Sequence, residues 1–267
     1  MLQQTQVDRV VPKFEAFVAA YPGVRELALA PIADVLRAWQ GLGYNSRAVR
    51  LKRAAEEVVA RFDGRIPSNE RDLRTLPGVG PYTVSAIRAF GFNLDDVPLD
   101  TNVRRIVHRV FFGLEHPPAA NRAQLDARAR EIAPAGMAHD WNSALMDLGA
   151  TICTARAPRC AACPLRGECV AAPIEAIELA ARRAAHAPQK SPQAAIRFER
   201  STRFARGRIV DRLRALPPGE AISLLDLHRD LAGALPERSV DEIGNIVSAL
   251  QRDGLVAVSG ERLALAE

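Results

Sequence analysis

A tight turn between two helical patterns constrains the fold of this chain more than any other stretch. The sequence LPGVGPYT occupies residues 76–83, where Gly78 and Gly80 flank Val79. Glycine accepts backbone angles that other residues avoid, so the turn can direct several main-chain N–H groups to one place, just before Tyr82 opens the next helix. This pattern predicts a phosphate-binding hairpin, although the same residues can also form a plain connection between two helices.

An aspartate follows this hairpin at the distance of one helix. Residues 81–90 have the apolar spacing of a helix, and VPLDTNVRR at 97–105 then places Asp100 directly before a further helical pattern. A carboxylate at that point is a candidate reactive group. Aspartate is also a residue type that caps helix N-termini without any chemistry, so both interpretations of Asp100 stay open.

The cysteines are concentrated in one short segment. They are Cys153, Cys160, Cys163 and Cys169, separated by six, two and five residues. Two disulfides would indicate an exported protein, but no export signal is recognisable. A four-cysteine zinc site normally uses two closely spaced pairs, and only Cys160 and Cys163 form such a pair. An iron–sulfur cluster, which takes four thiolates, is the third candidate.

Composition narrows the fold class and the kind of partner. The 267 residues are 48% hydrophobic and only 5% aromatic, and helix-forming residues dominate, which predicts a mostly α protein with room for two domains. The formal charge of +5 and the pI of about 9.4 permit nucleic acid as a partner without requiring it. No apolar run has the length of a membrane span and no signal peptide is recognisable, so we expect a cytoplasmic protein with no membrane partner.

Taken together, the hairpin, the aspartate and the cysteine spacing resemble the helix-hairpin-helix DNA glycosylase superfamily. Two further strings, MLQQTQV at 1–7 and GLGYNSRA at 41–48, resemble its MutY-type, adenine-specific branch, which acts on A/G mismatches. The resemblance implies a two-lobed helical fold with a [4Fe–4S] cofactor on Cys153, Cys160, Cys163 and Cys169. It also implies a monomer whose partner is double-stranded DNA with a mismatched or damaged base pair.

The resemblance assigns roles to individual residues. Asp100 would stabilise the sugar cation, Asn102 would orient the reacting groups, and Tyr82 would mark a monofunctional enzyme because it lacks the amine needed for a Schiff base. Gln4 and Tyr44 would fill the gap left by an extruded base. The implied DNA contacts are Gln3, Gln4, Thr5, Tyr44, Gly78, Val79 and Gly80. The family's proton-donating Glu would lie before Met1, so we expect this chain as given to bind mismatched DNA and to excise adenine slowly or not at all.

The domain organisation follows from these patterns. We expect a glycosylase region at 1–172, with the hairpin at about 70–90 and the cluster loop at 153–169, then a linker at 173–200 and a winged-helix-like module at 201–267. Helices are expected at 1–22, 31–44, 45–62, 101–113, 119–133, 139–153, 203–216, 223–231 and 239–253, and two strands at 255–266. Many relatives carry a larger C-terminal domain that recognises 8-oxoguanine, which leaves lesion specificity open.

Two other functions remain open at this point. A thymine-removing G/T-mismatch enzyme of the same superfamily can also carry a tyrosine at the position of Tyr82. A DNA-binding or damage-sensing protein with an inactive site is the alternative from a different class.

Overall fold

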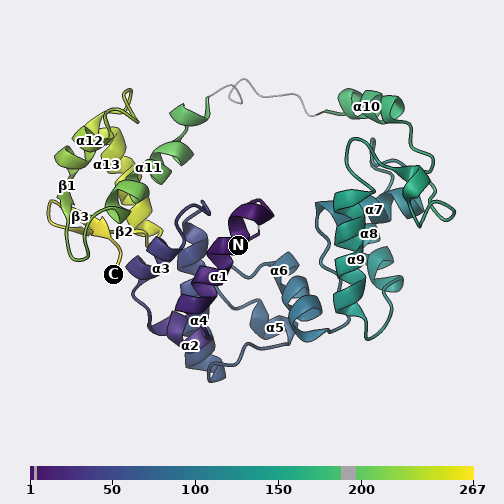
Figure 1. Ribbon diagram of the computed structural model, residues 1–267, viewed down its shortest axis with the longest axis horizontal. Coiled ribbons are helices and arrows are strands. Elements are labelled where there is room, and N and C mark those ends of the chain that lie inside the picture. The colour runs from purple at the N-terminus through teal and green to yellow at the C-terminus, as the bar shows by residue number, and fades with distance from the viewer. Residues whose placement is uncertain (3–4, 188–196) are drawn as a thin grey trace. The chain divides into compact units, whose positions relative to one another are not determined.

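The computed structural model describes residues 1–2, 5–187 and 197–267, and it is mostly helical (Figure 1). It divides into two compact units. Unit 1 comprises Met1–Ile66, Leu76–Gly78 and Ser191–Glu267, and unit 2 comprises Pro67–Thr75 and Val79–Lys190. The predicted DNA contacts Gln3 and Gln4, and part of the predicted linker, lie outside the described residues. Within the described ranges, no helix combines the length and apolar character that crossing a bilayer requires.

The first part of unit 1 consists of four helices. They are α1 (Val7–Ala20), α2 (Val24–Leu29), α3 (Ile32–Ala38) and α4 (Ser46–Phe62). The prediction that the first helix starts almost at Met1 is wrong, because its apolar repeat begins only at Val7 and Met1 packs separately against the core. The six-residue helix α2 was not anticipated, since it is too short to show a periodic pattern.

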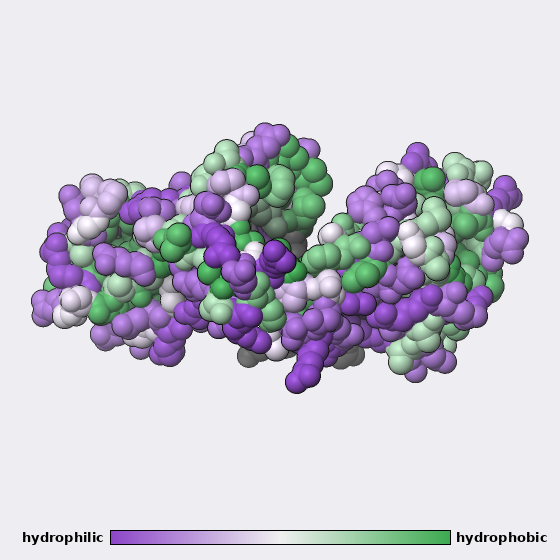
Figure 2. Space-filling view, turned by 90° about the horizontal axis from the view of Figure 1, so that it is seen from below, coloured by the Kyte–Doolittle hydropathy of each residue, from purple (hydrophilic) through white to green (hydrophobic). Residues whose placement is uncertain are grey.

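Helix α1 has two apolar faces. Val10 and Phe17 are buried in the core of unit 1. Val7, Val11, Phe14 and Val18 are exposed large hydrophobic residues on the other face. Figure 2 shows that apolar residues, in green, reach the molecular surface among polar ones, in purple. The helix is therefore attached through one face only.

In the described residues, the C-terminal part of unit 1 combines a 3₁₀ turn at Phe198–Arg200 and three α-helices with a small sheet. Its elements are α11 (Thr202–Arg214), β1 (Ile222–Ser223), α12 (Leu224–Leu231), α13 (Val240–Arg252), β2 (Val256–Ser259) and β3 (Arg262–Leu265). The strands are antiparallel in the order β1-β3-β2. Ser201, Ser223 and Ser239 cap the three helices with their side chains, as their hydroxyl chemistry favours. The predicted helices and strand pair are confirmed, and winged-helix-like module remains our interpretation of residues 201–267.

One apolar core serves both parts of unit 1. Ile209 and Leu213 of α11 and Leu250 of α13 belong to the same buried cluster as Leu36 of α3 and Val49 of α4. Burial of large aliphatic side chains is the main stabilising contribution in such packing, so the C-terminal residues are held against the N-terminal helices.

Unit 2 contains the hairpin and the cysteines. Its helices are α5 (Glu70–Leu73), α6 (Pro81–Ala86), α7 (Thr101–Phe112), α8 (Arg122–Glu131), α9 (Ala138–Thr151) and α10 (Ala176–Ala185), with a π-helical turn at Ile87–Gly91 and a 3₁₀ turn at Cys160–Ala162. Val103, Ile106, Val107 and Val110 face the core as predicted. Helix α10 falls inside the range 173–200 that we expected to be a linker, because Leu179 is fully buried there although its neighbours show no apolar stripe.

Candidate functional site

The hairpin turn offers main-chain donors. Gly78 has a φ of 79°, a left-handed angle that glycine adopts at little cost. A Cβ at Gly78 would lie 3.0 Å from Cβ of Arg50, so this cation packs directly against the turn. In the described part of the chain, the N–H groups of Gly78, Val79 and Gly80 donate to no protein acceptor. Unpaired main-chain donors in a tight turn suit an anion.

Asp100 is the N-cap of α7, as one of the two interpretations required. Its Oδ1 accepts a hydrogen bond of 2.7 Å from the Val103 N–H. Oδ2 accepts none from the described residues, and the side chain is partly exposed. The cap therefore fixes the carboxylate at the positive end of α7 and leaves its second oxygen without a partner among the described residues.

Tyr82 stands in the first turn of α6, directly after the hairpin. Burial, and then the negative charge of Asp100, raise the pKa of the Tyr82 phenol above its ordinary value. The electrostatic effect means that the two side chains are close enough to interact. At neutral pH the phenol is uncharged, and it can donate or accept a hydrogen bond but cannot form an imine.

A buried arginine connects Asn102 with the cysteine segment. Arg105 donates 2.9 Å to Asn102 Oδ1, 2.7 Å to the Gly149 carbonyl and 2.8 Å to the Cys153 carbonyl. A Cβ at Gly149 would lie 2.7 Å from Cβ of Asn102, so α9 and α7 approach closely where this network forms. Arg105 thus holds the Asn102 side chain in one orientation, two residues after Asp100.

The four cysteines are free thiols that line one cavity of about 20 Å³. Among the described residues, no three Cys, His, Asp or Glu side chains converge as a ready metal-binding group. Ile106, Leu148 and Leu165 share the cavity lining with the sulfurs. Four cysteines without disulfides around an apolar cavity have the donor chemistry that an iron–sulfur cluster requires, although the cavity as it stands has room for about one water.

A second buried arginine supports this segment. Arg109 is fully buried, donates 3.5 Å to Sγ of Cys153 and 2.8 Å to the Thr154 carbonyl, and pairs with Glu115 at 2.7 Å. Burial by itself raises the pKa of Glu115, but the hydrogen bonds and charge of Arg109 outweigh it and hold that pKa below its ordinary value. Burial raises the pKa of the Cys169 thiol, with hydrogen bonds from two backbone N–H groups opposing it.

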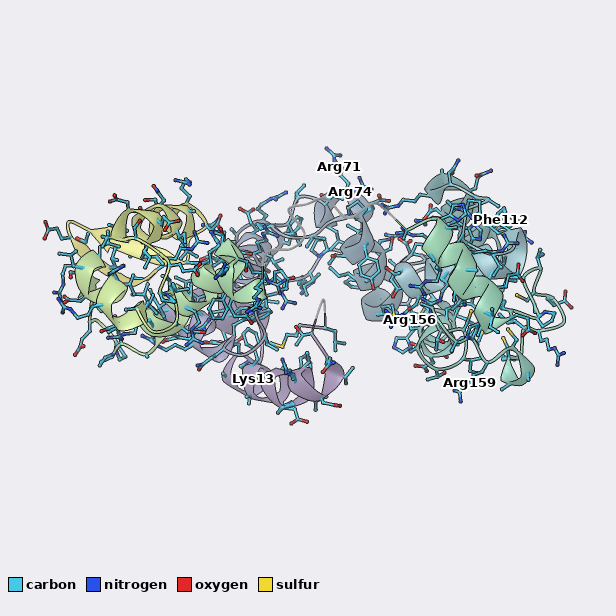
Figure 3. The ribbon with its side chains drawn as sticks, turned by 90° about the horizontal axis from the view of Figure 1, so that it is seen from above. Lys13, Arg71, Arg74, Phe112, Arg156 and Arg159 are labelled. Carbon is cyan, nitrogen blue, oxygen red and sulfur yellow. The ribbon has the colours of Figure 1, made fainter. Side chains whose placement is uncertain are left out.

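Arginines also lie on the outside of the cysteine segment. Figure 3 shows Arg156 and Arg159 there, and Arg159 donates two hydrogen bonds to the Thr151 carbonyl at the end of α9. That guanidinium therefore caps a helix C-terminus. Arg71 extends away from the ribbon near α5 in the same view. Both Arg156 and Arg71 are exposed and available to an anionic partner.

The loop between α3 and α4 holds Tyr44 in an unusual conformation. Tyr44 has a φ of 48° and lies beside Gly43, whose φ is 66°. Thr5 Oγ1 donates 3.1 Å to the Leu42 carbonyl, which connects the start of the chain to this loop. A non-glycine residue in the left-handed region costs roughly 1–2 kcal/mol, so surrounding contacts must hold it.

The predicted residues divide between the two units. Thr5, Tyr44 and Gly78 lie in unit 1, whereas the remaining described candidates lie in unit 2. Those candidates are Val79, Gly80, Tyr82, Asp100, Asn102, Cys153, Cys160, Cys163 and Cys169. Sequence reasoning missed Arg105 and Arg109, because arginines on a basic helix are ordinarily solvent-exposed. Arg105 and Arg109 are four residues apart and lie on the same face of α7 as the buried Ile106, and this spacing could have indicated that they are buried.

A helical protein with a glycine-rich hairpin, a following aspartate and four grouped cysteines belongs to a class of DNA-repair folds. Residues 1–131 match the model of the HhH-GPD superfamily base excision DNA repair proteins. A solved thermostable thymine-DNA glycosylase superposes with a TM-score of 0.59 and 30% identity, over 63% of this chain and 78% of that one.

Curated relatives place the chain more narrowly. The adenine DNA glycosylase of Mycolicibacterium smegmatis is 44% identical over 165 residues, 62% of this chain and 56% of the relative. That of Mycobacterium tuberculosis is 38% identical over 222 residues, 80% of this chain and 68% of the relative. The chain belongs to the adenine DNA glycosylase family of the HhH-GPD superfamily. It spans little more than half the length of the first of these relatives.

Proposed function

We propose that this chain is a base-excision-repair glycosylase that removes adenine mispaired with guanine or 8-oxoguanine. The reaction would be hydrolysis of the N-glycosidic bond, leaving an abasic site without cutting the strand. The observation that carries the proposal is Asp100, fixed by its cap to α7 with one oxygen unpaired, one helix after the hairpin. The 38–44% identity to adenine DNA glycosylases supports adenine as the base.

The side chains suit an oxocarbenium-like transition state. The free oxygen of Asp100 would face the positive charge that develops on the sugar, and a fixed charge needs no reorganisation during the reaction. Asn102, held by Arg105, would orient the groups beside it. Tyr82 remains uncharged and offers no amine, which favours a monofunctional reaction. The residue that protonates the leaving base is assigned to no side chain of this chain.

DNA would be held by the hairpin and by exposed cations. The N–H groups of Gly78, Val79 and Gly80 would donate to a phosphate, with Arg50 adding charge next to Gly78. Thr5 and Tyr44 would contact the strands near the extruded nucleotide, a role that also includes Gln3 and Gln4. Such contacts make binding strongly dependent on salt, since each neutralised phosphate releases counterions.

The four cysteines would hold a [4Fe–4S] cluster. Cys153, Cys160, Cys163 and Cys169 are the ligands, and the cluster would fasten the segment after α9 to α7. Arg109 would place a positive charge beside the Cys153 sulfur, which favours a thiolate there. We propose a cytoplasmic, nucleoid-associated monomer that acts on double-stranded DNA. Residues 1–172 would be the glycosylase region, 173–200 the linker and 201–267 the winged-helix-like module.

The test is base release from defined duplexes. Duplexes with A opposite G, A opposite 8-oxoguanine and T opposite G are incubated with the chain as given and with a version extended by the N-terminal segment of the Mycolicibacterium smegmatis relative. The extended version is expected to release adenine, and strand breaks should appear only after alkali. Asp100→Asn keeps the helix cap and removes the charge, so it should bind DNA normally and lose about 100-fold or more in rate.

Other outcomes would point elsewhere. Release of thymine alone would favour the thymine glycosylase, the alternative that the 30% identical solved structure supports. Mismatch binding with no base release from either version would favour an inactive DNA-binding protein. A covalent adduct trapped by borohydride as the main product would contradict the role of Tyr82. Equal rates for the chain as given and the extended version would show that the upstream Glu is dispensable.

A further inference from the structure

A pocket of about 860 Å³ opens within unit 1 between the 41–46 loop and α11. The loop contributes the Tyr44 side, and the first three turns of α11 contribute arginines. The site residues already described line one edge of this pocket, whereas its other edge belongs to the winged-helix-like module. No role has so far been assigned to that module.

One arginine of the pocket has no acidic partner in the described part of the chain. The guanidinium carbon of Arg203 lies 4.0 Å from the ring centroid of Tyr44 and 5.7 Å from that of Phe198. Arg206, in contrast, pairs with Asp253, and Arg214 pairs with Asp211. Arg203 is exposed, so its charge is directed at solvent in the pocket.

The stacking fixes how Arg203 can bind. A guanidinium is planar, and an aromatic ring takes up one of its faces. Its N–H donors lie in the plane and stay available at the edge, which is the geometry that binds two oxygens of one phosphate. Arg203 also stands in the first turn of α11, where the helix dipole favours negative charge. The arrangement is prepared for a phosphate before any ligand arrives.

The same module holds the Tyr44 loop in place. Arg214 of α11 is almost fully buried and donates 2.8 Å to Oδ1 of Asn45, the residue after Tyr44. Because Tyr44 has a strained φ of 48°, contacts of this kind are what keep the loop in one conformation. Loop and module therefore act as one binding surface.

We propose that this pocket binds a phosphodiester of a DNA strand, with Arg203 as the direct contact beside the Tyr44 ring. The winged-helix-like module is then part of the DNA-binding surface. The inference rests on the proposed function, because it takes Tyr44 to face DNA. Arg208 also lines the pocket and is exposed on α11, but it lies 4.0 Å from the Asp211 carboxylate, so Arg203 is the cation that the proposal depends on.

The experiment measures salt-dependent binding of the full chain to a labelled duplex with A opposite 8-oxoguanine. Arg203→Ala should weaken binding about tenfold at low salt and lower the slope of log K against log salt by about 0.9, the value for one phosphate. Arg203→Lys keeps the charge and loses the planar stack, so it should keep the slope and lose affinity about threefold. Arg229→Ala is the control, because Arg229 is an exposed arginine of the same module outside the pocket.

Unchanged affinity and slope for Arg203→Ala would overturn the site, as would an equal loss for Arg229→Ala. Base release, measured in parallel on the extended version, separates the two proposals. If the extended version releases adenine normally and Arg203→Ala binds DNA like the wild type, only the proposal for the pocket is overturned. If binding depends on Arg203 but the extended version releases no adenine, only the proposed enzyme activity is overturned. Absence of any DNA binding by the wild type would overturn both.

Discussion

Replacing Gly78 with alanine tests the hairpin directly. Gly78 has a φ of 79°, and an added Cβ would lie 3.0 Å from Cβ and 3.2 Å from Cδ of Arg50. Alanine at this angle costs roughly 1–2 kcal/mol, and Arg50 must also shift by a few tenths of an ångström. The turn would relax toward a different conformation of the backbone that carries these N–H groups.

The expected loss in DNA affinity follows from that strain. If the native turn is needed for the phosphate contact, a penalty of about 1–2 kcal/mol corresponds to about 5–30-fold weaker binding. The free energy of unfolding should fall by a similar amount. Because the lost donors are uncharged N–H groups, the slope of log K against log salt should change little.

Gly136 supplies the matched control. Its φ of 74° gives alanine the same backbone strain, but a Cβ there meets nothing within 4 Å, and its N–H is bonded to Asp95 away from the hairpin. Gly136→Ala should therefore lower stability comparably and leave DNA binding unchanged. The assays are urea unfolding and fluorescence anisotropy with a mismatched duplex. Wild-type affinity for Gly78→Ala, or an equal binding defect for Gly136→Ala, would refute the reasoning.

Three further predictions concern unit 2. Glu115→Gln leaves the buried Arg109 guanidinium without its carboxylate and should cost about 3–5 kcal/mol by urea unfolding at pH 7, whereas Glu131→Gln, at an exposed pair, should cost under about 1 kcal/mol. The folded-state pKa of Glu115 is lowered, so its contribution to the free energy of unfolding is fully present above the unfolded pKa of about 4.5. That contribution is lost as pH falls through the lowered pKa, so the stabilities of Glu115→Gln and the wild type should converge in acid. Cys163→Ser should abolish the brown colour and bound iron of the purified protein; stoichiometric zinc in the wild type would contradict the cluster. Tyr82→Phe should keep the alkaline limb of the pH–rate profile up to about pH 10, because the phenol is neutral there, and a changed limb would contradict that state.

Local sequence signals predicted most of the helices and the position of Asp100. Apolar spacing identified α4, α7 and α13, and the cap position before α7 follows from one residue type at one place. Such signals depend on neighbours along the chain. Local signals did not predict α10, because only one of its side chains, that of Leu179, is buried and the helix shows no apolar repeat.

The supporting residues of the site could not be predicted in the same way. Arg105 is buried because carbonyls 44 and 48 residues further along the chain reach it, and no local pattern encodes that meeting. Arg203 stacks on Tyr44 although the two residues lie far apart in the sequence. Burial of a cation and stacking on a ring both depend on which distant segments the core brings together.

The one-sided attachment of α1 has a consequence for local opening. Only Val10 and Phe17 anchor this helix in the core, and Pro12 within it donates no amide hydrogen bond to the preceding turn. Its backbone amides should therefore exchange with solvent deuterium well before those of α13, whose buried side chains are Ile243, Ile246, Val247 and Leu250. Thr5 lies just before the N-cap of this helix and donates a hydrogen bond to the Leu42 carbonyl, so local opening of α1 would also loosen its contact with the loop that carries Tyr44.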